Sequence, residues 1–179
     1  MTALTIALFG ATGRTGRLVL AQALDSGYTV RALARRPEAV TQASDRLTIV
    51  PGDVLDRVAV EQTVRGSDVV ISVFGHVKGS PPTVQADGTK NIVEAMQREQ
   101  ITLIISLSGG GLPAEEHDRP GVADRVIRFL LKTLLPQVLD DARQHLEVLK
   151  SSGLDWTVAR GPRLTTPPRQ ARSGSAGLA

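Results

Sequence analysis

The sequence predicts an α/β protein, a single domain built on a doubly wound parallel sheet in three α/β/α layers. Apolar runs of strand length alternate with segments of helical period along the chain, an alternation typical of parallel strands joined by helices. A glycine-rich turn joins the first apolar run to the first helical segment. Right-handed crossovers then favour the strand order 3-2-1-4-5-6, with helices on both faces of the sheet.

Six apolar runs are expected to form the strands. They cover residues 6–9, 28–34, 47–50, 68–73, 101–106 and 154–159. Helical periodicity fills the intervals, at residues 17–26, 57–64, 84–99, 122–135 and 138–152. Asp56 is expected to cap the second helix, and Gly27 and Gly153 to end the first and the last.

Length and composition indicate one soluble globular domain. The chain has 179 residues, of which 41% are hydrophobic, and this is enough for one core. Residues 1–165 are expected to form the domain, and residues 166–179, rich in Pro, Ser and Gly, a disordered tail. No signal peptide and no stretch long enough to span a bilayer is evident. We therefore expect a cytoplasmic protein that binds no membrane.

The residue content argues against metal and nucleic-acid sites. The chain has no cysteine, which excludes disulfides and thiolate metal sites. Its three histidines are far apart and no carboxylate cluster is evident, so no metal site is expected. The net charge is +3, but the arginines are scattered and few aromatic residues lie between them. This pattern does not favour a specific nucleic-acid site.

The turn after the first strand indicates a phosphate-binding site. Its sequence is Gly10-Ala11-Thr12-Gly13-Arg14-Thr15-Gly16. Gly10 permits a tight turn, Gly13 lets the backbone approach a phosphate, and Gly16 lets the helix pack on the strand. We expect Gly10, Thr12, Gly13, Arg14 and Thr15 to contact the pyrophosphate of a dinucleotide. The alternative is a structural turn without a ligand.

Two arginines at the end of the second strand favour NADP(H) over NAD(H). An acidic residue at this place would bind the ribose 2′-hydroxyl of NAD, but the chain has Arg35 and Arg36 there. A guanidinium group suits the 2′-phosphate of NADP, and Arg14 could reach the same phosphate. The alternative is that Arg35 and Arg36 are solvated surface charges ahead of Pro37.

The third and fourth strands end in further candidates for the cofactor site. Asp53 and Val54 could bind the adenine, through a carboxylate that accepts from its amino group, although Asp53 could equally belong to an ordinary turn. Phe74 and Gly75 are expected beside the ribose and the phosphates. His76 is either a polar group on the substrate side or, as we favour, an exposed loop residue.

Ser108, at the end of the fifth strand, is the candidate catalytic residue. Its hydroxyl could hydrogen-bond the nicotinamide carboxamide or a substrate carbonyl, and the alternative is a turn-forming serine before a glycine run. His145 borders the apolar stripe of its helix, where a packed or surface residue is favoured over a catalyst. Asp140 and Asp141 are interpreted as favouring the positive start of that helix.

Four motifs resemble those of the atypical short-chain dehydrogenase/reductases, in particular the NAD(P)H-binding, NmrA-like set that includes flavin reductases of biliverdin reductase B type. They lie at residues 10–16, 52–54, 88–92 and 152–157, and the resemblance covers residues 3–165. It implies a Rossmann domain that binds NADP through the glycine turn, Arg35, Asp53 and Val54. It also implies that Ser108 matches the active-site serine and that Pro162 lines the nicotinamide pocket.

The chain departs from this family pattern at three places. The Tyr-x-x-x-Lys motif of the wider superfamily is absent, since the single tyrosine is Tyr28 in the second predicted strand. Arg163 follows the matched proline where the flavin reductase has a histidine. The Pro/Ser/Gly tail stands where the family continues into another strand and helix. The absence of the Tyr-x-x-x-Lys motif excludes a tyrosine–lysine proton relay.

These observations lead to two hypotheses of different classes. The first is an NADPH-dependent oxidoreductase that transfers hydride to a flat conjugated acceptor such as a flavin, quinone or bilin. The alternative is a non-catalytic NADP(H)-binding redox sensor of NmrA-like type, and an epimerase or dehydratase is a third, weaker interpretation. A homodimer would explain the excess apolar surface of helix 122–135, but burial within the monomer would explain it equally.

Overall fold

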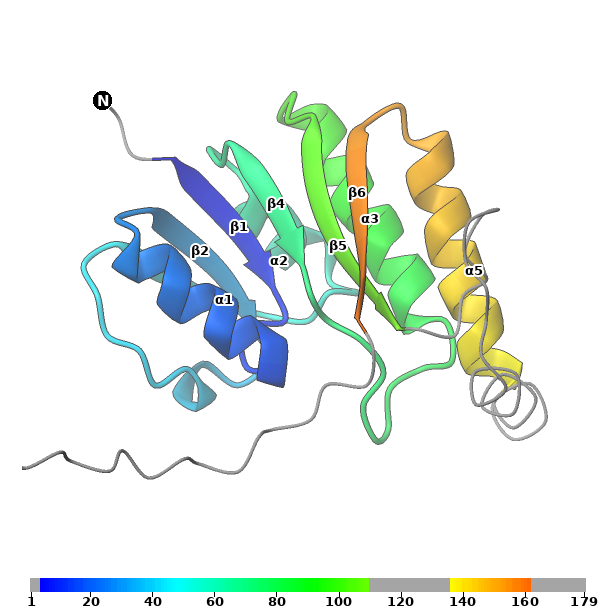
Figure 1. Cartoon of the computed structure of the whole chain (residues 1–179), viewed down its shortest axis with the longest axis horizontal. Helices are drawn as coiled ribbons and strands as arrows, with labels where there is room; N and C mark the ends of the chain where they lie inside the picture. Colours follow the sequence, from blue (N-terminus) through cyan, green and yellow to red (C-terminus); the bar gives the residue numbers. More distant parts are fainter. Residues whose placement is uncertain (1–3, 110–135, 162–179) are drawn as a thin grey trace, which may run out of the picture.

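The structure, a computed structural model, describes residues 4–109 and 136–161 as one parallel sheet flanked by helices (Figure 1). Its six strands have the order β3-β2-β1-β4-β5-β6, which confirms the predicted order. The strands are β1 (Thr5–Phe9), β2 (Thr29–Ala34), β3 (Leu47–Pro51), β4 (Val69–Ser72), β5 (Leu103–Gly109) and β6 (Asp155–Gly161). The helices are α1 (Arg14–Asp25), the short 3-10 helix η1 (Pro37–Ala39), α2 (Arg57–Val64), α3 (Val84–Arg98) and α5 (Pro136–Ser151).

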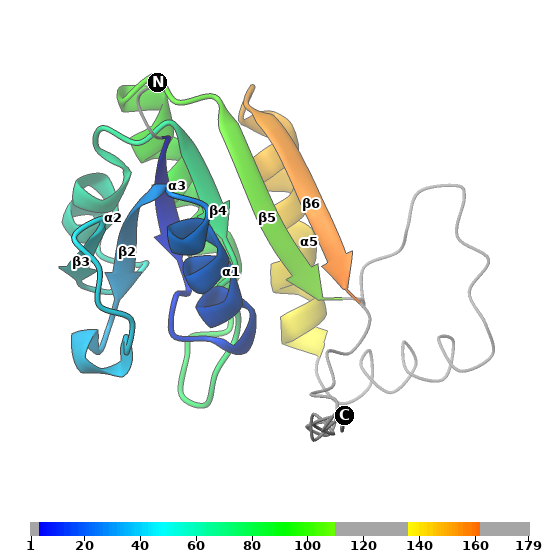
Figure 2. The same ribbon diagram turned by 60° about the vertical axis from the view of Figure 1, so that its left-hand side comes forward.

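The direction of each crossover decides which face a helix covers. The chain steps from β1 outward to β2 and β3, and later from β4 outward to β5 and β6 on the other side. Right-handed crossovers in opposite directions place their helices on opposite faces. Accordingly, α1 lies on one face, and α2, α3 and α5 lie on the other (Figures 1 and 2).

Each face of the sheet has its own hydrophobic core. On the α1 face, Leu8 of β1 and Val30 of β2 are fully buried with Leu20 of α1. On the other face, Phe9 and Ile104 pack with residues of α2, α3 and α5. Successive residues of a strand point to opposite faces, so neighbours such as Leu8 and Phe9 belong to different cores.

The two faces differ in how far they are covered. On the α1 side of β5, Leu103 and Ile105 are each 37% exposed. No helix among residues 4–109 and 136–161 lies over that part of the sheet (Figure 2). The buried side of the same strand, in contrast, faces α3 and α5.

Two helix boundaries show how local chemistry sets the ends of elements. Asp56 caps α2 as predicted, since its carboxylate accepts hydrogen bonds from the amides of Val58 and Ala59. The sequence predicts that the fifth strand begins at Ile101, but in the structure β5 begins at Leu103. The amide of Ile101 donates to the Met96 carbonyl at 2.9 Å, after Gln100 with φ 57°, and so closes α3.

Several expectations fall outside the described residues. These are the helix at residues 122–135, the tail at residues 166–179, Pro162 and Arg163. Among the helices that the structure does describe, none combines the length and the apolar character needed to cross a bilayer. The described residues also contain no group of three or more His, Cys, Asp or Glu side chains placed to bind a metal ion.

Candidate functional site

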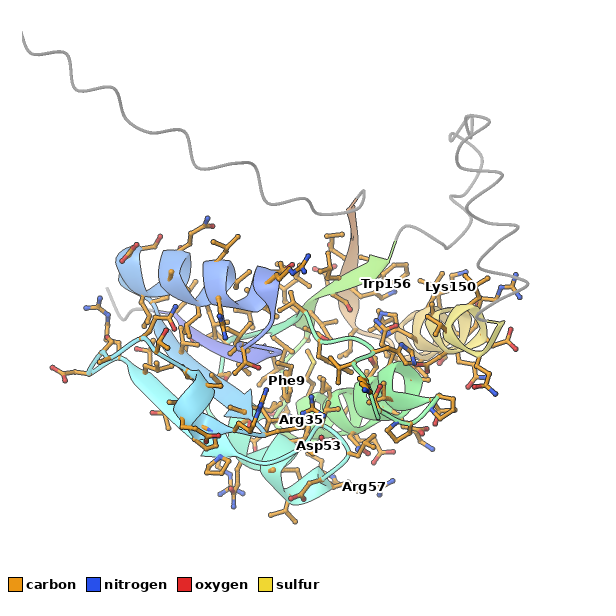
Figure 3. All side chains as sticks on the ribbon, turned by 90° about the horizontal axis from the view of Figure 1, so that it is seen from below. Phe9, Arg35, Asp53, Arg57, Lys150 and Trp156 are labelled. Atoms are coloured by element: carbon orange, nitrogen blue, oxygen red, sulfur yellow. The ribbon has the colours of Figure 1, made fainter. Side chains whose placement is uncertain are left out.

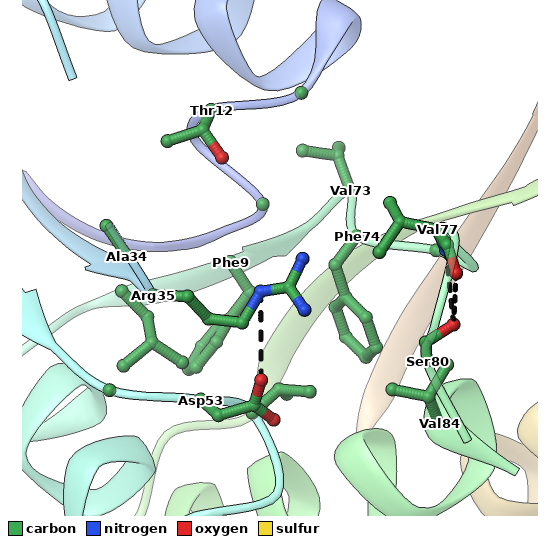
Figure 4. A pocket seen from close by; sticks show the side chains of 16 residues that line it. Phe9, Thr12, Ala34, Arg35, Asp53, Val73, Phe74, Val77, Ser80 and Val84 are labelled. Carbon is green, nitrogen blue, oxygen red and sulfur yellow. Dashed lines mark hydrogen bonds and ion pairs between the residues drawn. The ribbon is translucent and has the colours of Figure 1, made fainter. Parts of the chain in front are cut away.

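A pocket lies at the carboxyl ends of β1, β2, β3 and β4, where the sheet order reverses around β1 (Figure 4). Figure 3 looks onto this edge and shows Phe9, Arg35 and Asp53 close together there. The lining residues come from the strand ends and from the loops that follow them. They are Phe9, Gly10, Thr12, Gly13, Leu33, Ala34, Arg35, Gly52, Asp53, Val54, Val73, Phe74, Gly75, Val77, Ser80 and Val84.

Two of the turn glycines are required by close packing. Gly10 has φ +92°, and a Cβ atom added there would lie 2.7 Å from the Phe74 amide nitrogen. A Cβ atom added at Gly16 would lie 2.0 Å from the Gly10 carbonyl oxygen. The close packing at Gly16 agrees with the predicted role of this glycine, whereas the contact of Gly10 with the segment that follows β4 was not predicted.

The N-terminus of α1 is free to receive an anion from the pocket. Gly13 is the N-cap residue, so no side chain caps the helix, and the first turn has no acidic residue. The first helical hydrogen bond runs from the Arg17 amide to the Gly13 carbonyl at 3.0 Å. The Gly13 amide donates to the Gly10 carbonyl at 3.0 Å, so the amides of residues 14–16 are the ones that point beyond the helix end, where the macrodipole is positive. This geometry suits a pyrophosphate group.

Arg35 and Asp53 form an ion pair at the mouth of the pocket (Figure 4). The Arg35 Nε atom lies 3.7 Å from Asp53 Oδ2, and the two side chains are 57% and 40% exposed. The other oxygen, Oδ1, accepts a hydrogen bond from the Leu55 amide at 2.9 Å. Asp53 is thereby oriented, while the guanidinium group remains accessible to a ligand.

The floor of the pocket is apolar, formed by Val54 and Phe74, and α3 packs against it. A Cβ atom added at Gly88 would lie 2.8 Å from a methyl carbon of Val54 and 2.9 Å from the Phe74 ring. Asn91, one turn further along α3, donates from Nδ2 to the Val54 carbonyl at 3.1 Å. The motif at residues 88–92 therefore supports the floor and does not itself line the pocket.

The structure brings together most, but not all, of the predicted cofactor residues. Those that line the pocket are Gly10, Thr12, Gly13, Arg35, Asp53, Val54, Phe74 and Gly75. Arg14, Thr15 and Arg36 do not line it. Ser108 is the residue before the last one of β5 and is paired in register with Arg160 of β6, but its side chain, like Pro162, lies outside the described residues.

The sequence did not single out three residues of the pocket wall. Val77, Ser80 and Val84 line the pocket from the segment that joins β4 to α3. The Ser80 amide donates to the Val77 carbonyl at 3.0 Å, which closes a turn around Gly79. The Gly79 signal and the two following prolines predict a turn, but no local pattern says that this turn folds back onto the pocket.

A buried polar cluster lies between β5, α3 and α5. His145 is 1% exposed, and its Nδ1 and Nε2 atoms lie 2.8 Å from Thr89 Oγ1 and 3.1 Å from Ser106 Oγ. Burial lowers the pKa of His145 from its usual 6.5, and the nearby Asp141 carboxylate opposes this shift. A neutral imidazole donates to one hydroxyl and accepts from the other. Of the two alternatives that the sequence favoured, a packed or a surface residue, the structure shows the packed one.

Two interpretations from the sequence were wrong in this region. Asp141 does not serve the start of its own helix, since its carboxylate accepts from the Gln85 and Ala86 amides at the start of α3. His76 is not simply an exposed loop residue, because its side chain is only 20% exposed and lies against Asp141. Both contacts join residues far apart in the sequence, so no local pattern indicates them.

Comparison with known proteins identifies the family of the chain. The model of the NAD(P)H-binding family matches residues 10–177. One relative, the (4-alkanoyl-5-oxo-2,5-dihydrofuran-3-yl)methyl phosphate reductase of Streptomyces griseus, is 30% identical over 155 residues, which cover 87% of this chain and 46% of the relative. This chain spans between 13% and 61% of the length of this relative and of other relatives that are 30–34% identical to it.

Two solved structures share the fold. A short-chain dehydrogenase/reductase of Veillonella parvula in complex with NADP has a TM-score of 0.69 at 22% identity, covering 89% of this chain and 69% of that one. ChuY, an anaerobilin reductase of Escherichia coli, has a TM-score of 0.68 at 20% identity, covering 88% and 72%. The glycine turn, the uncapped helix and the pocket at the strand ends, together with the family match, lead to one conclusion: the chain belongs to the NAD(P)H-binding family and has the Rossmann-like fold of the short-chain dehydrogenase/reductases.

Proposed function

We propose that this protein is an NADPH-dependent reductase that passes hydride to a flat conjugated acceptor of the flavin, quinone or bilin type. The observation that carries the proposal is the position of Arg35, at the rim of the pocket that begins at the glycine turn. An NAD enzyme of this architecture has a carboxylate at that place, whereas a guanidinium group binds the 2′-phosphate of NADP.

The described residues fit the adenosine half of the cofactor. The amides of the glycine turn and of the first turn of α1 would bind the pyrophosphate. Asp53 and Val54 would bind the adenine edge above the apolar floor, and Arg35 the 2′-phosphate. Because Arg35 already faces the Asp53 carboxylate at 3.7 Å, its guanidinium group is directed across the mouth of the pocket before any ligand binds.

The nicotinamide half would extend along the sheet edge toward β5. A bound nicotinamide would supply the hydride, and the Ser108 hydroxyl would orient the carboxamide or the carbonyl of the acceptor. Pro162 would line the same region. The completing proton would come from solvent, because the single tyrosine of the chain, Tyr28, cannot serve. Tyr28 precedes β2 at the amino-terminal edge of the sheet, opposite the pocket.

The named relatives support reduction as the reaction class. The reductase from Streptomyces griseus and the anaerobilin reductase from Escherichia coli are both described as reductases. The second acts on a bilin-type compound, as its name says, and bilins are flat and conjugated. A conjugated acceptor needs little acid catalysis, which agrees with the absence of the tyrosine–lysine pair.

Stopped-flow mixing tests this proposal. Protein loaded with NADPH is mixed with FMN, a benzoquinone or biliverdin, and the loss of absorbance of NADPH is followed. We expect oxidation faster than in the same mixture without protein. Unchanged traces with all three acceptors, from a protein that binds NADPH, would contradict the assignment as a reductase.

The second candidate is a redox sensor that binds NADP(H) without turnover. The observation that favours it is the position of Tyr28, since the family's proton relay has no counterpart in this chain. A sensor would distinguish NADPH from NADP⁺ in affinity and would catalyse no transfer. Titration of both forms, followed by the turnover experiment above, separates the two candidates.

A further inference from the structure

The segment between β4 and α3 forms one wall of the pocket. It comprises residues 73–83 and continues into the first residue of α3. The pocket-lining residues that it and α3 supply are Val73, Phe74, Gly75, Val77, Ser80 and Val84. This wall touches the phosphate-binding turn directly, because a Cβ atom added at Gly10 would lie within 3 Å of the backbone of Val73 and Phe74. Any shift of the wall would therefore change the shape of the turn.

A carboxylate from a third element fixes the far end of this wall. Asp141 of α5 is 1% exposed. Its Oδ1 atom accepts from the Ala86 amide at 2.8 Å and its Oδ2 atom from the Gln85 amide at 2.9 Å. The N-cap residue of α3, Thr83, makes no capping hydrogen bond with its own side chain. Asp141 thus caps α3 from another helix and balances its charge against the positive helix end.

His76 connects the same carboxylate to the near end of the wall. The His76 Nε2 atom lies 3.1 Å from Asp141 Oδ2 and 3.0 Å from the Pro82 carbonyl oxygen. Both partners are acceptors, so Nε2 carries a hydrogen atom. The imidazole therefore closes the base of the loop at residues 77–81 and fastens it to α5.

We propose that His76 and Asp141 are positioning residues that hold the β4–α3 segment as the wall of the dinucleotide pocket. The proposal rests on the proposed function for the identity of the ligand. Neither residue lines the pocket, so each acts through the backbone that it holds. With the pair intact, the wall is ordered before the cofactor binds, and binding loses less conformational entropy.

The test uses two substitutions at His76 and one matched control. His76→Ala removes both contacts from a partly exposed position, and His76→Gln restores an amide N–H that can donate to them. The control is Val30→Ala, which opens a cavity at a fully buried residue near the amino end of β2, away from the wall. For each protein, the Kd for NADPH is measured by fluorescence titration, and Tm by thermal unfolding. Amide hydrogen exchange of residues 74–84 is measured by mass spectrometry without cofactor.

We expect His76→Ala to raise the Kd for NADPH about tenfold and to speed exchange in residues 74–84 by a similar factor. His76→Gln should restore most of the affinity for NADPH and most of the protection from exchange. Val30→Ala should lower Tm at least as much as His76→Ala, but it should leave the Kd for NADPH and the exchange of residues 74–84 near the wild-type values.

Two results would overturn the proposal. One is wild-type exchange and wild-type Kd in His76→Ala, and the other is an equal change in the Val30→Ala control. If the wild-type protein binds no NADPH, the proposed function fails instead. In that case the exchange rates of residues 74–84 still decide whether His76 holds the wall.

Discussion

Arg35 and Asp53 show how two exposed residues acquire a defined relation from the sheet. They follow the neighbouring strands β2 and β3, whose residues Ala34 and Pro51 are paired in register. Parallel pairing brings the two loops to the same edge, and the side chains meet across the mouth of the pocket at 3.7 Å. An exposed pair of this kind contributes little to stability, since such pairs stabilise by about 0–1 kcal/mol. Its importance is to direct the guanidinium group.

The first prediction separates Arg35 from its neighbour Arg36. Arg35→Ala should weaken NADPH binding by about 1–3 kcal/mol, the range for losing a charge-assisted hydrogen bond, with a much smaller effect on NADH. Arg36→Ala is the matched control and should change neither affinity much, because Arg36 does not line the pocket. Fluorescence titration of the wild type and both variants with NADPH and NADH measures the dissociation constants. An equal loss for NADPH and NADH in Arg35→Ala would show that Arg35 does not recognise the 2′-phosphate.

The second prediction concerns the buried imidazole of His145. Burial lowers its pKa below 6.5 in the folded protein, so the unfolded chain binds the proton more readily. This contribution to stability is present above pH 6.5 and is lost as the pH falls toward the folded-state pKa. The free energy of unfolding should therefore fall as the solution is made acidic through this range.

Urea unfolding at a series of pH values on either side of 6.5 measures this effect. The variant His145→Gln keeps hydrogen-bonding groups near Thr89 and Ser106 but cannot titrate. We expect its unfolding free energy to fall less steeply with acidification than that of the wild type. Parallel curves for the two proteins would mean that another group causes the pH dependence.

The first turn of α1 packs closely against the glycine turn through Gly16. The third prediction is that Gly16→Ala lowers the free energy of unfolding by about 1–3 kcal/mol or more, the usual effect of overpacking. Its Cβ atom would lie 2.0 Å from the Gly10 carbonyl oxygen. Gly75→Ala is the control, because a Cβ atom there meets no atom within 4 Å. If Gly16→Ala were as stable as Gly75→Ala, the tight packing of the turn on α1 would be wrong.

The fourth prediction compares two kinds of stabilisation in α2. Asp56→Ala removes the N-cap and should lower the free energy of unfolding by about 1 kcal/mol. Arg57→Ala breaks an exposed ion pair with Glu94 of α3, 3.6 Å apart, and should lower it by less than about 0.5 kcal/mol. Urea unfolding of the two variants provides the comparison. A larger effect of Arg57→Ala than of Asp56→Ala would contradict this ranking.

Elements with strong local signals could be predicted from the sequence, and contacts between distant elements could not. The Asp56 cap, the glycine turn and the alternation of strands depend on neighbouring residues, and the structure confirms them. Asp141 also lies in a recognisable helix. However, the amides that it caps belong to Gln85 and Ala86 of another helix, and this partnership follows only from the packing of α5 against α3.

The same distinction holds for the candidate site. Arg35 and Asp53 could be predicted because parallel strands bring their carboxyl ends to one edge. Val77 and Ser80 could not, since their place in the pocket depends on how a loop with two prolines folds back. The sequence pattern also did not separate Arg35 from Arg36. In the structure Arg35 lines the pocket and Arg36 does not, since Arg36 is the N-cap residue of the short helix η1.

At the scale of the whole molecule, the strand order determines where a ligand can bind. The chain leaves β1 in one direction toward β2 and returns to β4 on its other side. The loops after β1 and β4 therefore separate to opposite faces, and a crevice opens between them at the carboxyl edge. The glycine turn, Arg35, Asp53 and the wall held by His76 all border this crevice, although they come from four separate segments of the chain.

We propose that this crevice binds NADP(H) and recognises its 2′-phosphate, and the assignment as a reductase depends on this claim. Fluorescence titration of the wild-type protein at low ionic strength, with the oxidised and reduced forms of both dinucleotides, measures this binding. We expect saturable binding of NADPH, tighter than that of NADH by about tenfold or more, the difference that a charge-assisted contact provides. Failure of all four dinucleotides to bind, or equal affinities for NADPH and NADH, would contradict the claim.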